Sequence, residues 1–311
     1  MVKRNIIILL SIFLIVFFLR FPKVYIKDDQ PYDQAVAKWA KGRFVTVENK
    51  KIHYLEKGEG RPVILIHGFL YHNVMWKKNV DQLAKKFKVY VIDLWGWGYS
   101  ERLKVKDYSF ENYAKQIVGF MDALKIPKAS LVGQSMGGGI SVYAAAHFPD
   151  RVDKLILIDP AVIPYPETTT AQIYQIPFVG EFLNALPGNG LLKMNIQKIW
   201  FYDPQKVTDS YVEEVARPLA IKGSLEGMMT ILRKVLKEPF VEKEAHTLAG
   251  LHKPILIVHG REDKAIPLDR SEKLQALWKG SQLVVFEKAG HTPQEEYPEK
   301  FNTLALEFLS K

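Results

Sequence analysis

The stretch from Ala129 to Gly137, ASLVGQSMG, runs from an apolar segment into a Gly-x-Ser-x-Gly motif centred on Ser135. The residues before the motif predict a β-strand, and those after it predict a helix that runs to about His147 and ends before Pro149. A turn this tight between a strand and a helix admits only glycine at two flanking positions, and it pushes the serine hydroxyl out above the sheet. We therefore expect Ser135 to be a nucleophile above a helix N-terminus, where the helix dipole stabilises developing negative charge.

Short β-rich runs on both sides of this motif alternate with helical stretches. Such alternation indicates an α/β fold with a mostly parallel sheet of eight strands and helices on both faces. Three of the runs are wholly apolar, as expected for central strands that helices cover on both sides. The expected strands are 44–47, 52–55, 63–66, 89–92, 129–132, 155–158, 255–258 and 283–286.

One long interval, 161–251, interrupts this alternation. It carries no convincing central strand, but several helical stretches that prolines separate. We interpret it as a helical cap inserted between two halves of the α/β core, 44–160 and 252–311. Residues 28–43 are interpreted as a linker with a short interfacial helix.

The N-terminal segment, residues 1–27, is typical of a membrane-targeting element. Lys3 and Arg4 precede a run, 6–19, that is apolar except for one serine. At about 1.5 Å per residue, residues 5–21 span roughly 25 Å, slightly less than a hydrocarbon core of about 30 Å. Because no small-x-small cleavage site follows, we expect an uncleaved single-pass membrane anchor, with signal cleavage and secretion as the alternative.

The composition excludes several other classes of protein. The chain of 311 residues has no cysteine, so disulfides, thiol nucleophiles and thiolate metal sites are excluded. Its formal net charge is +9, but the basic residues are scattered and no nucleic-acid-binding signature accompanies them, so we expect no nucleic-acid partner. A basic surface is better suited to anionic lipid headgroups.

In its strand–turn–helix context, the Ser135 motif resembles that of the α/β-hydrolase family, and the resemblance covers roughly Phe44 to the C-terminus. His67-Gly68-Phe69-Leu70 follows the apolar run 63–66 and is similar to the family's His-Gly motif. The resemblance implies an oxyanion hole made by the backbone N–H groups of Phe69 and Met136. Neither position then needs a particular side chain.

The resemblance also implies the base and the acid. The family places its histidine in a loop after the last strand, where this chain has His291 within a Gly-His turn. The loop after residues 255–258 has the family's Gly-x-x-Asp pattern and ends at Asp263, which is the expected acid. Asp159 is the alternative, because it ends the run 155–158, from which some family members supply the acid.

Other polar and aromatic residues near these motifs are interpreted as structural or as pocket residues. His67 is expected to hydrogen-bond its loop without transferring a proton, and His72 and His259 are expected to be loop or strand-end residues. The aspartate of Asp93-Leu94-Trp95-Gly96-Trp97-Gly98 resembles a structural residue of the family. Trp95 and Trp97 are candidates for binding substrate, with packing against neighbouring loops as the equal alternative.

A serine at position 135 narrows the chemistry, because the related haloalkane dehalogenases and epoxide hydrolases use aspartate there. We expect a membrane-tethered serine hydrolase that cleaves a carboxylic ester, such as a lipid or another hydrophobic acyl substrate, through an acyl-enzyme and with no metal or organic cofactor. A meta-cleavage carbon–carbon hydrolase is the alternative. Those enzymes typically carry Asn before the serine, where this chain has Gln134. A non-catalytic scaffold with the same fold is the rival from another class.

Overall fold

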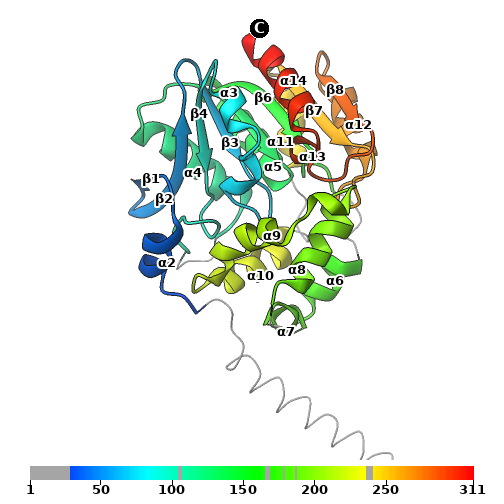
Figure 1. Ribbon diagram of the computed structural model, residues 1–311. Helices are drawn as coiled ribbons and strands as arrows, with labels where there is room; N and C mark the ends of the chain where they lie inside the picture. Colours follow the sequence, from blue (N-terminus) through cyan, green and yellow to red (C-terminus); the bar gives the residue numbers. More distant parts are fainter. Residues whose placement is uncertain (1–28, 104–106, 165–168, 178, 186–187, 236–240) are drawn as a thin grey trace, which may run out of the picture.

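The computed structural model describes residues 29–103, 107–164, 169–177, 179–185, 188–235 and 241–311. Its centre is an eight-stranded sheet in the order β1-β2-β4-β3-β5-β6-β7-β8 (Figure 1). The predicted mostly parallel sheet is confirmed. Only the pairs β1–β2 and β2–β4 are antiparallel, and all other pairs of neighbouring strands are parallel. The strands are β1 Arg43–Val47, β2 Lys50–Lys57, β3 Pro62–Ile66, β4 Lys88–Ile92, β5 Ala129–Gln134, β6 Val152–Ile158, β7 Ile255–Gly260 and β8 Gln282–Phe286.

Helices cover both faces of this sheet, and the predicted α/β layering is confirmed (Figure 1). Along β3, Ile64 and Ile66 enter the core under α4, α5 and α11, whereas Val63 and Leu65 enter the core under α3 and α14, because successive side chains point to opposite faces. The described helices are α2 Tyr32–Trp39, α3 Val80–Leu83, α4 Phe110–Ala123, α5 Met136–His147, α6 Thr169–Gln175, α7 Val179–Ala185, α8 Gly190–Asn195, α9 Asp209–Ala216, α10 Ser224–Val235, α11 Glu242–Ala249, α12 Leu268–Leu277, α13 Pro293–Glu296 and α14 Pro298–Ser310.

Helices α6 to α10 lie between β6 and β7 in the sequence and gather at one end of the sheet (Figure 1). They approach the loops that follow the parallel strands. The backbone N–H of His291, after β8, donates to the carbonyl of Trp200 at 2.7 Å, and the Tyr211 hydroxyl on α9 lies 3.0 Å from that of Tyr71, after β3. This helical segment therefore contacts the end of the sheet where α/β proteins place their sites.

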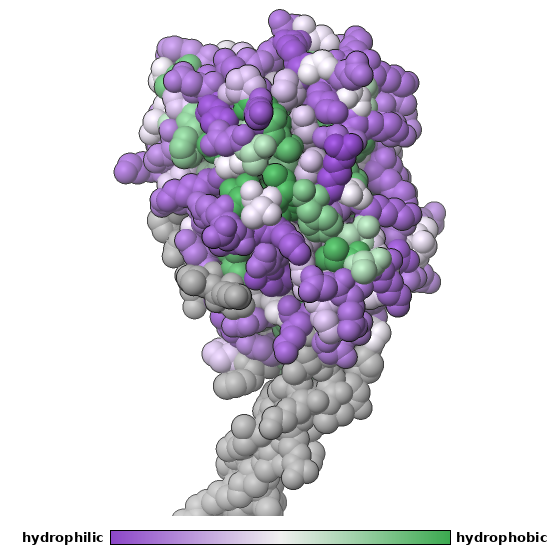
Figure 2. Space-filling view, turned by 90° about the vertical axis from the view of Figure 1, so that its left-hand side faces the viewer, coloured by the Kyte–Doolittle hydropathy of each residue, from purple (hydrophilic) through white to green (hydrophobic). Residues whose placement is uncertain are grey.

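The first described residues make several contacts with the rest of the molecule. Gln30 forms an isolated bridge with Ile221, and the Tyr32 hydroxyl on α2 donates to the Tyr99 carbonyl at 3.0 Å. Figure 2 shows the side of the molecule that carries β1, β2 and α2, where hydrophilic residues cover most of the surface and apolar ones gather near its centre. The predicted membrane segment, residues 1–27, lies outside the described residues. Within the part of the chain that the structure describes, no helix is long and apolar enough to cross a membrane.

Candidate active site

Ser135 occupies the turn between β5 and α5, with φ of 52° and ψ of −117°. A positive φ is strained for a residue with a side chain, and such strain gathers at functional sites. Neighbouring glycines make the turn possible, because a Cβ on Gly133 would stand 2.6 Å from Ser141 Oγ, and one on Gly137 would stand 2.7 Å from the His67 carbonyl oxygen. The turn thus has the backbone geometry expected of a nucleophile turn, and Ser135 is 9% exposed.

The His67-Gly68-Phe69 loop after β3 passes beside this serine. A Cβ on Gly68 would stand 3.1 Å from the Ser135 Cβ and would clash with the Gln134 side chain, so only glycine allows this approach. Met136 is the first residue of α5, where a backbone N–H has no intrahelical partner. Phe69 and Met136 are therefore on the two segments that flank Ser135, as an oxyanion hole requires.

His291 and Asp263 form a buried hydrogen-bonded pair. The Nδ1 of His291 lies 2.7 Å from Oδ2 of Asp263, and the two side chains are 7% and 1% exposed. The other oxygen of Asp263 accepts from the backbone N–H groups of Ala265 at 2.7 Å and Ile266 at 3.1 Å. Burial raises the pKa of Asp263, but its charge interaction and hydrogen bond with His291 more than offset this effect, so that the pKa of Asp263 lies below its ordinary value. The carboxylate is charged and orients the imidazole.

The backbone of His291 is fixed on both sides. Its N–H donates to the Trp200 carbonyl at 2.7 Å, and its carbonyl accepts from Gln134 Nε2 at 2.8 Å. Because Gln134 precedes Ser135, this bond holds the histidine loop against the nucleophile turn. The structure therefore brings Ser135, His291 and Asp263 into one site, and their catalytic roles remain predictions.

Asp159, the alternative acid, lies in the same cluster. One oxygen of each carboxyl of Asp159 and Asp263 and a ring nitrogen of His291 lie within 4.8 Å of one another. Oδ1 of Asp159 accepts from the Gly260 N–H at 2.9 Å, whereas Asp263 is the residue that is hydrogen-bonded to His291. These three atoms form the only grouping in the described chain close enough to ligate a metal, but the Nδ1 proton of His291 already binds Asp263. The geometry favours Asp263 as the acid.

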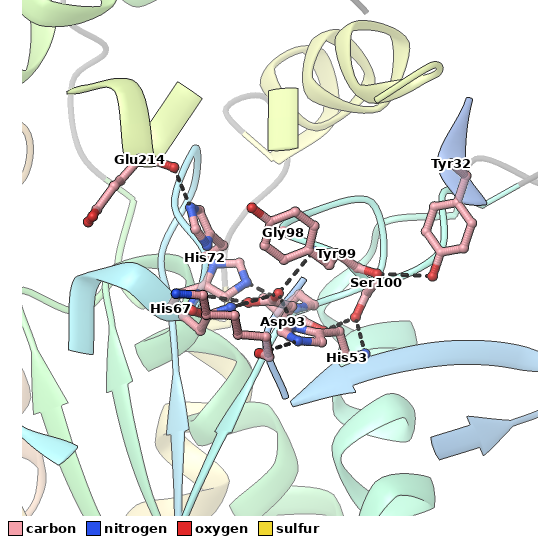
Figure 3. A network of polar contacts seen from close by, with 12 residues as sticks. Tyr32, His53, His67, His72, Asp93, Gly98, Tyr99, Ser100 and Glu214 are labelled. Carbon is pink, nitrogen blue, oxygen red and sulfur yellow. Dashed lines mark hydrogen bonds and ion pairs between the residues drawn. The ribbon is translucent and has the colours of Figure 1, made fainter. Parts of the chain in front are cut away.

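Asp93 organises a buried polar network beside the site (Figure 3). Its carboxylate lies 2.7 Å from His53 Nδ1 and accepts from the backbone N–H groups of Asn73 at 2.7 Å and Tyr99 at 2.9 Å. Burial raises the pKa of Asp93, but its hydrogen bond and charge interaction with His53 lower it well below its ordinary value. These contacts match the structural role expected for this aspartate, whereas its partner His53 gave no signal in the sequence.

Three buried histidines at or near strand ends make structural hydrogen bonds. His67 Nε2 accepts from the Leu94 N–H at 3.0 Å, so its Nδ1 carries the proton that is donated to the Gly68 carbonyl at 2.8 Å. Burial lowers the pKa of His67 to about 4, which keeps the ring neutral. His72 contacts the Glu214 carbonyl at 3.1 Å, and His259 contacts Ser271 Oγ at 2.8 Å. These contacts match the interpretation of all three as structural residues.

Trp95 and Trp97 are both buried in the core beneath α4. Trp97 Nε1 donates to the Tyr113 hydroxyl at 3.1 Å, and its ring packs edge-on against Phe69 with centroids 5.1 Å apart. The Trp95 ring lies beneath the Lys50 ammonium at 4.7 Å. Packing is therefore the role that these contacts describe, and substrate binding remains a prediction for both residues.

A second polar cluster joins the helical segment to the site loops and was not anticipated from the sequence. The Tyr211 hydroxyl lies 2.8 Å from Glu295 Oε2 and 3.0 Å from the Tyr71 hydroxyl. Burial raises the pKa of Glu295 to about 8. Tyr71 follows the oxyanion loop and Glu295 follows His291, so Tyr211 bridges the two loops from α9.

Comparisons with known proteins identify the fold family of this chain. A family model described as alpha/beta hydrolase fold matches residues 61–298. The 2-hydroxymuconate semialdehyde hydrolase of a Pseudomonas species is 31% identical over 280 residues, which cover 87% of this chain and 94% of that protein. The crystal structure of a meta-cleavage product hydrolase from Pseudomonas fluorescens is 29% identical with a TM-score of 0.75, covering 86% of this chain and 97% of that chain. A thermophilic esterase from Thermogutta terrifontis is 26% identical with a TM-score of 0.72, covering 87% and 98%.

Proposed function

Because the chain belongs to the α/β-hydrolase fold family, we propose that it is a serine hydrolase that cleaves a carbon–carbon bond beside a carbonyl group in a small dienone acid. In this proposal Ser135 is the nucleophile, His291 is the general base, and Asp263 is the acidic residue that pairs with His291. The observation that best supports this mechanism is the 2.7 Å hydrogen bond between His291 and Asp263. Gln134, beside the nucleophile, donates a hydrogen bond to the loop that contains His291. Asp263 orients the imidazole and stabilises it when it is charged.

The residues divide the reaction into two halves. His291 takes the Ser135 proton as Oγ bonds to the substrate carbonyl carbon, and the resulting oxyanion accepts hydrogen bonds from the Phe69 and Met136 N–H groups. Before this attack the substrate tautomerises from its dienol to its keto form, in which the hydroxyl proton has moved to the carbon beside the carbonyl group. When the tetrahedral intermediate then collapses, the carbon–carbon bond breaks, its electron pair passes into the enone of the leaving fragment to give a dienolate, and the dienolate takes the proton from His291. Water then gives its proton to His291, attacks the acyl-enzyme and releases the acid and Ser135.

Similarity to named hydrolases supports carbon–carbon cleavage over the ester hydrolysis expected from the sequence alone. The relative named for 2-hydroxymuconate semialdehyde and the related meta-cleavage product hydrolase each align over more than four-fifths of this chain. Ester hydrolysis remains the second candidate for two reasons. The thermophilic esterase is 26% identical over a similar share of the chain, and Gln134 stands where carbon–carbon hydrolases typically carry Asn.

A substrate comparison on the purified full-length chain in detergent tests the proposal. The substrates are 2-hydroxymuconate semialdehyde, followed by loss of its dienol absorbance, and p-nitrophenyl esters with acyl chains of two to sixteen carbons. We expect turnover of the dienone acid, and a loss of roughly a thousandfold or more in Ser135→Ala and His291→Ala. Ser310→Ala and His147→Ala replace exposed residues of the same types and serve as controls.

The outcomes separate the candidate functions. Turnover of esters alone moves ester hydrolysis ahead, with the best chain length giving the size of the acyl pocket. Absence of both activities, together with absence of labelling by a fluorophosphonate, favours the non-catalytic scaffold.

We also propose that residues 1–27 anchor the chain in a membrane. The apolar run 6–19 with basic residues on both sides supports this, and so does the lack of a small-x-small cleavage site. Fractionation of cells that express the full chain tests it. The protein is expected in the membrane pellet, resistant to alkaline carbonate, and recovery in the culture medium after loss of the first residues would instead indicate a cleaved signal sequence.

A further inference from the structure

Two carboxyl groups share a buried site, although the proposed mechanism uses only one. Asp159 follows β6 and Asp263 follows β7, two neighbouring central strands, and both side chains are almost fully buried. The charged and titratable groups that face Asp159 are Asp263, His291, His259 and, at longer range, Glu296. None of these is a lysine or an arginine.

The imidazole between the two acids does not neutralise them. His259 Nε2 lies 3.5 Å from Asp159 Oδ1 and 3.7 Å from Asp263 Oδ2, but 3.1 Å from the Ile266 carbonyl, to which it donates. Its other ring nitrogen contacts Ser271 Oγ at 2.8 Å, a partner that can donate to it. Burial lowers the pKa of His259, so the ring is neutral. Two carboxylates here would face each other without a fixed positive charge.

Hydrogen-bond donors are divided unequally between the two acids. Asp263 accepts from His291 Nδ1 and from the N–H groups of Ala265 and Ile266, which stabilise its negative charge. Asp159 accepts at Oδ1 from the N–H of Gly260 at 2.9 Å, while no N–H or O–H group of the described residues donates to its buried Oδ2. A buried oxygen without a donor is costly as a carboxylate but is satisfied as a hydroxyl that donates. The adjacent acceptor is the carboxyl group of Asp263, since one oxygen of each acid lies within 4.8 Å of the other.

We propose that Asp159 carries a proton at neutral pH and donates a hydrogen bond from Oδ2 to the Asp263 carboxylate, making it a positioning residue for the catalytic pair. This inference rests on the proposed function, because it assigns Asp159 a role through Asp263 and His291. Burial and the charge of Asp263 both raise the pKa of Asp159, in agreement with the geometry. The Asp159 backbone supports the arrangement, since its φ of 42° turns the chain and its N–H donates to the Val258 carbonyl at 2.9 Å.

Asparagine distinguishes a neutral Asp159 from a charged one. Asp159→Asn keeps a donor on one side and an acceptor for Gly260 on the other, and it removes a negative charge only if Asp159 has one. In the proposal, the pH midpoint for fluorophosphonate labelling of the full-length protein stays within about 0.3 units of wild type, because the charge near His291 is unchanged. Loss of an ionised carboxylate so close to His291 would lower the midpoint by about one to two units and overturn the proposal.

Leucine removes the donor altogether. Asp159→Leu is expected to lower the labelling rate at the optimum by about tenfold and to raise the midpoint, because Asp263 then binds the imidazolium more strongly. A rate and midpoint equal to wild type would overturn the proposal. The control for surface charge is Asp153→Asn on the same strand, whose side chain is 37% exposed beside Lys128, and no change is expected.

An infrared measurement decides the question without any activity. The spectrum of wild type minus Asp159→Asn at pH 7 is expected to contain the carbonyl band of a protonated carboxyl group, and its absence would overturn the proposal. The difference isolates Asp159 from Glu295, whose raised pKa also keeps a proton near pH 7. A wild type that shows the band but does not label rejects the proposed function while supporting the inference.

Discussion

Gln134 Nε2 donates a hydrogen bond of 2.8 Å to the backbone carbonyl of His291, 157 positions later in the chain. Gln134 is 1% exposed, and its side-chain oxygen, Oε1, lies against Gly68 in the oxyanion loop. One side chain therefore spans the histidine loop and the oxyanion loop on either side of Ser135. Gln134 therefore helps to fix the distance between the His291 loop and the oxyanion loop.

Replacing Gln134 tests this spanning role. Gln134→Ala removes the bond to the His291 carbonyl, and a displacement of about 1 Å at the base costs on the order of a hundredfold in kcat/KM. Gln134→Glu keeps the length but turns a carboxylate oxygen toward that carbonyl, so we expect a loss at least as large. Initial rates with the substrate that the wild type turns over are the measurement.

The control for Gln134 is Gln82→Ala, whose side chain accepts a bond from Lys85 on the exposed side of α3. We expect wild-type activity from it. Equal activity in Gln134→Glu and wild type would show that the His291 loop is held by other contacts, such as the Trp200 carbonyl.

Asp93→Asn tests the network in Figure 3 through stability. The substitution removes the charge that His53 and two backbone N–H groups stabilise, and breaking a buried pair of this kind costs about 3 kcal/mol or more. The pKa of Asp93 is lowered from an ordinary 3.8, so the stabilisation is present above that pH and is lost as pH falls below it.

Urea denaturation at pH 7 and at pH 3 measures this effect. The difference in unfolding free energy between wild type and Asp93→Asn is expected to shrink at the lower pH. A difference that stays constant between the two would mean that packing, not the charge, provides the stabilisation.

The strands and the nucleophile turn could be predicted from the sequence because both are local patterns. The run 155–158 is apolar at every position. The glycines around Ser135 indicate a tight turn in which side chains at those positions would clash. The pairing of Asp159 with Asp263 was harder, because each looked like a candidate for a single role. A usable signal existed, since both end apolar runs that become adjacent parallel strands.

The clusters that the sequence did not reveal depend on contacts between distant positions. His53 and Asp93 are 40 residues apart, and Tyr211 and Glu295 are 84 residues apart. His53 lies within a short β-rich run and Tyr211 within a helical segment. No local sequence pattern at either position predicts which residue it will contact. Only the packing of α9 on the loops after the strands brings Tyr211 to Glu295.

Glu295→Gln tests the cluster that Tyr211 closes. The pKa of Glu295 is raised from an ordinary 4.5 to about 8, so the folded state keeps a proton that the unfolded state releases. Stability is therefore greatest below pH 4.5 and falls as pH rises toward 8, by at most about 1.4 kcal/mol per pH unit. Glutamine does not ionise and still accepts from Tyr211.

The measurement is the unfolding free energy in urea at pH 5, 6.5 and 8. Glu295→Gln is expected to lose less stability across this range than wild type and to be the more stable protein at pH 8. Parallel curves for the two proteins would show that Glu295 is ionised throughout, as a solvated carboxylate would be.

Gly260→Ala tests how closely β7 must approach the loop that carries His291. A Cβ at this position would stand 2.6 Å from the Ala289 carbonyl oxygen and would also collide with the Gly290 carbonyl, and backbone atoms on both sides cannot rotate away as a flexible side chain could. The loop must move, and the Gly260 N–H that Asp159 accepts moves with it. We therefore expect a loss of about a hundredfold in kcat/KM with a smaller change in KM, because the base is displaced while the substrate pocket remains.

Gly190→Ala is the matched control, since a Cβ there meets no atom within 4 Å. Full activity in Gly260→Ala would mean that the His291 loop tolerates displacement, and it would weaken the assignment of His291 as the base.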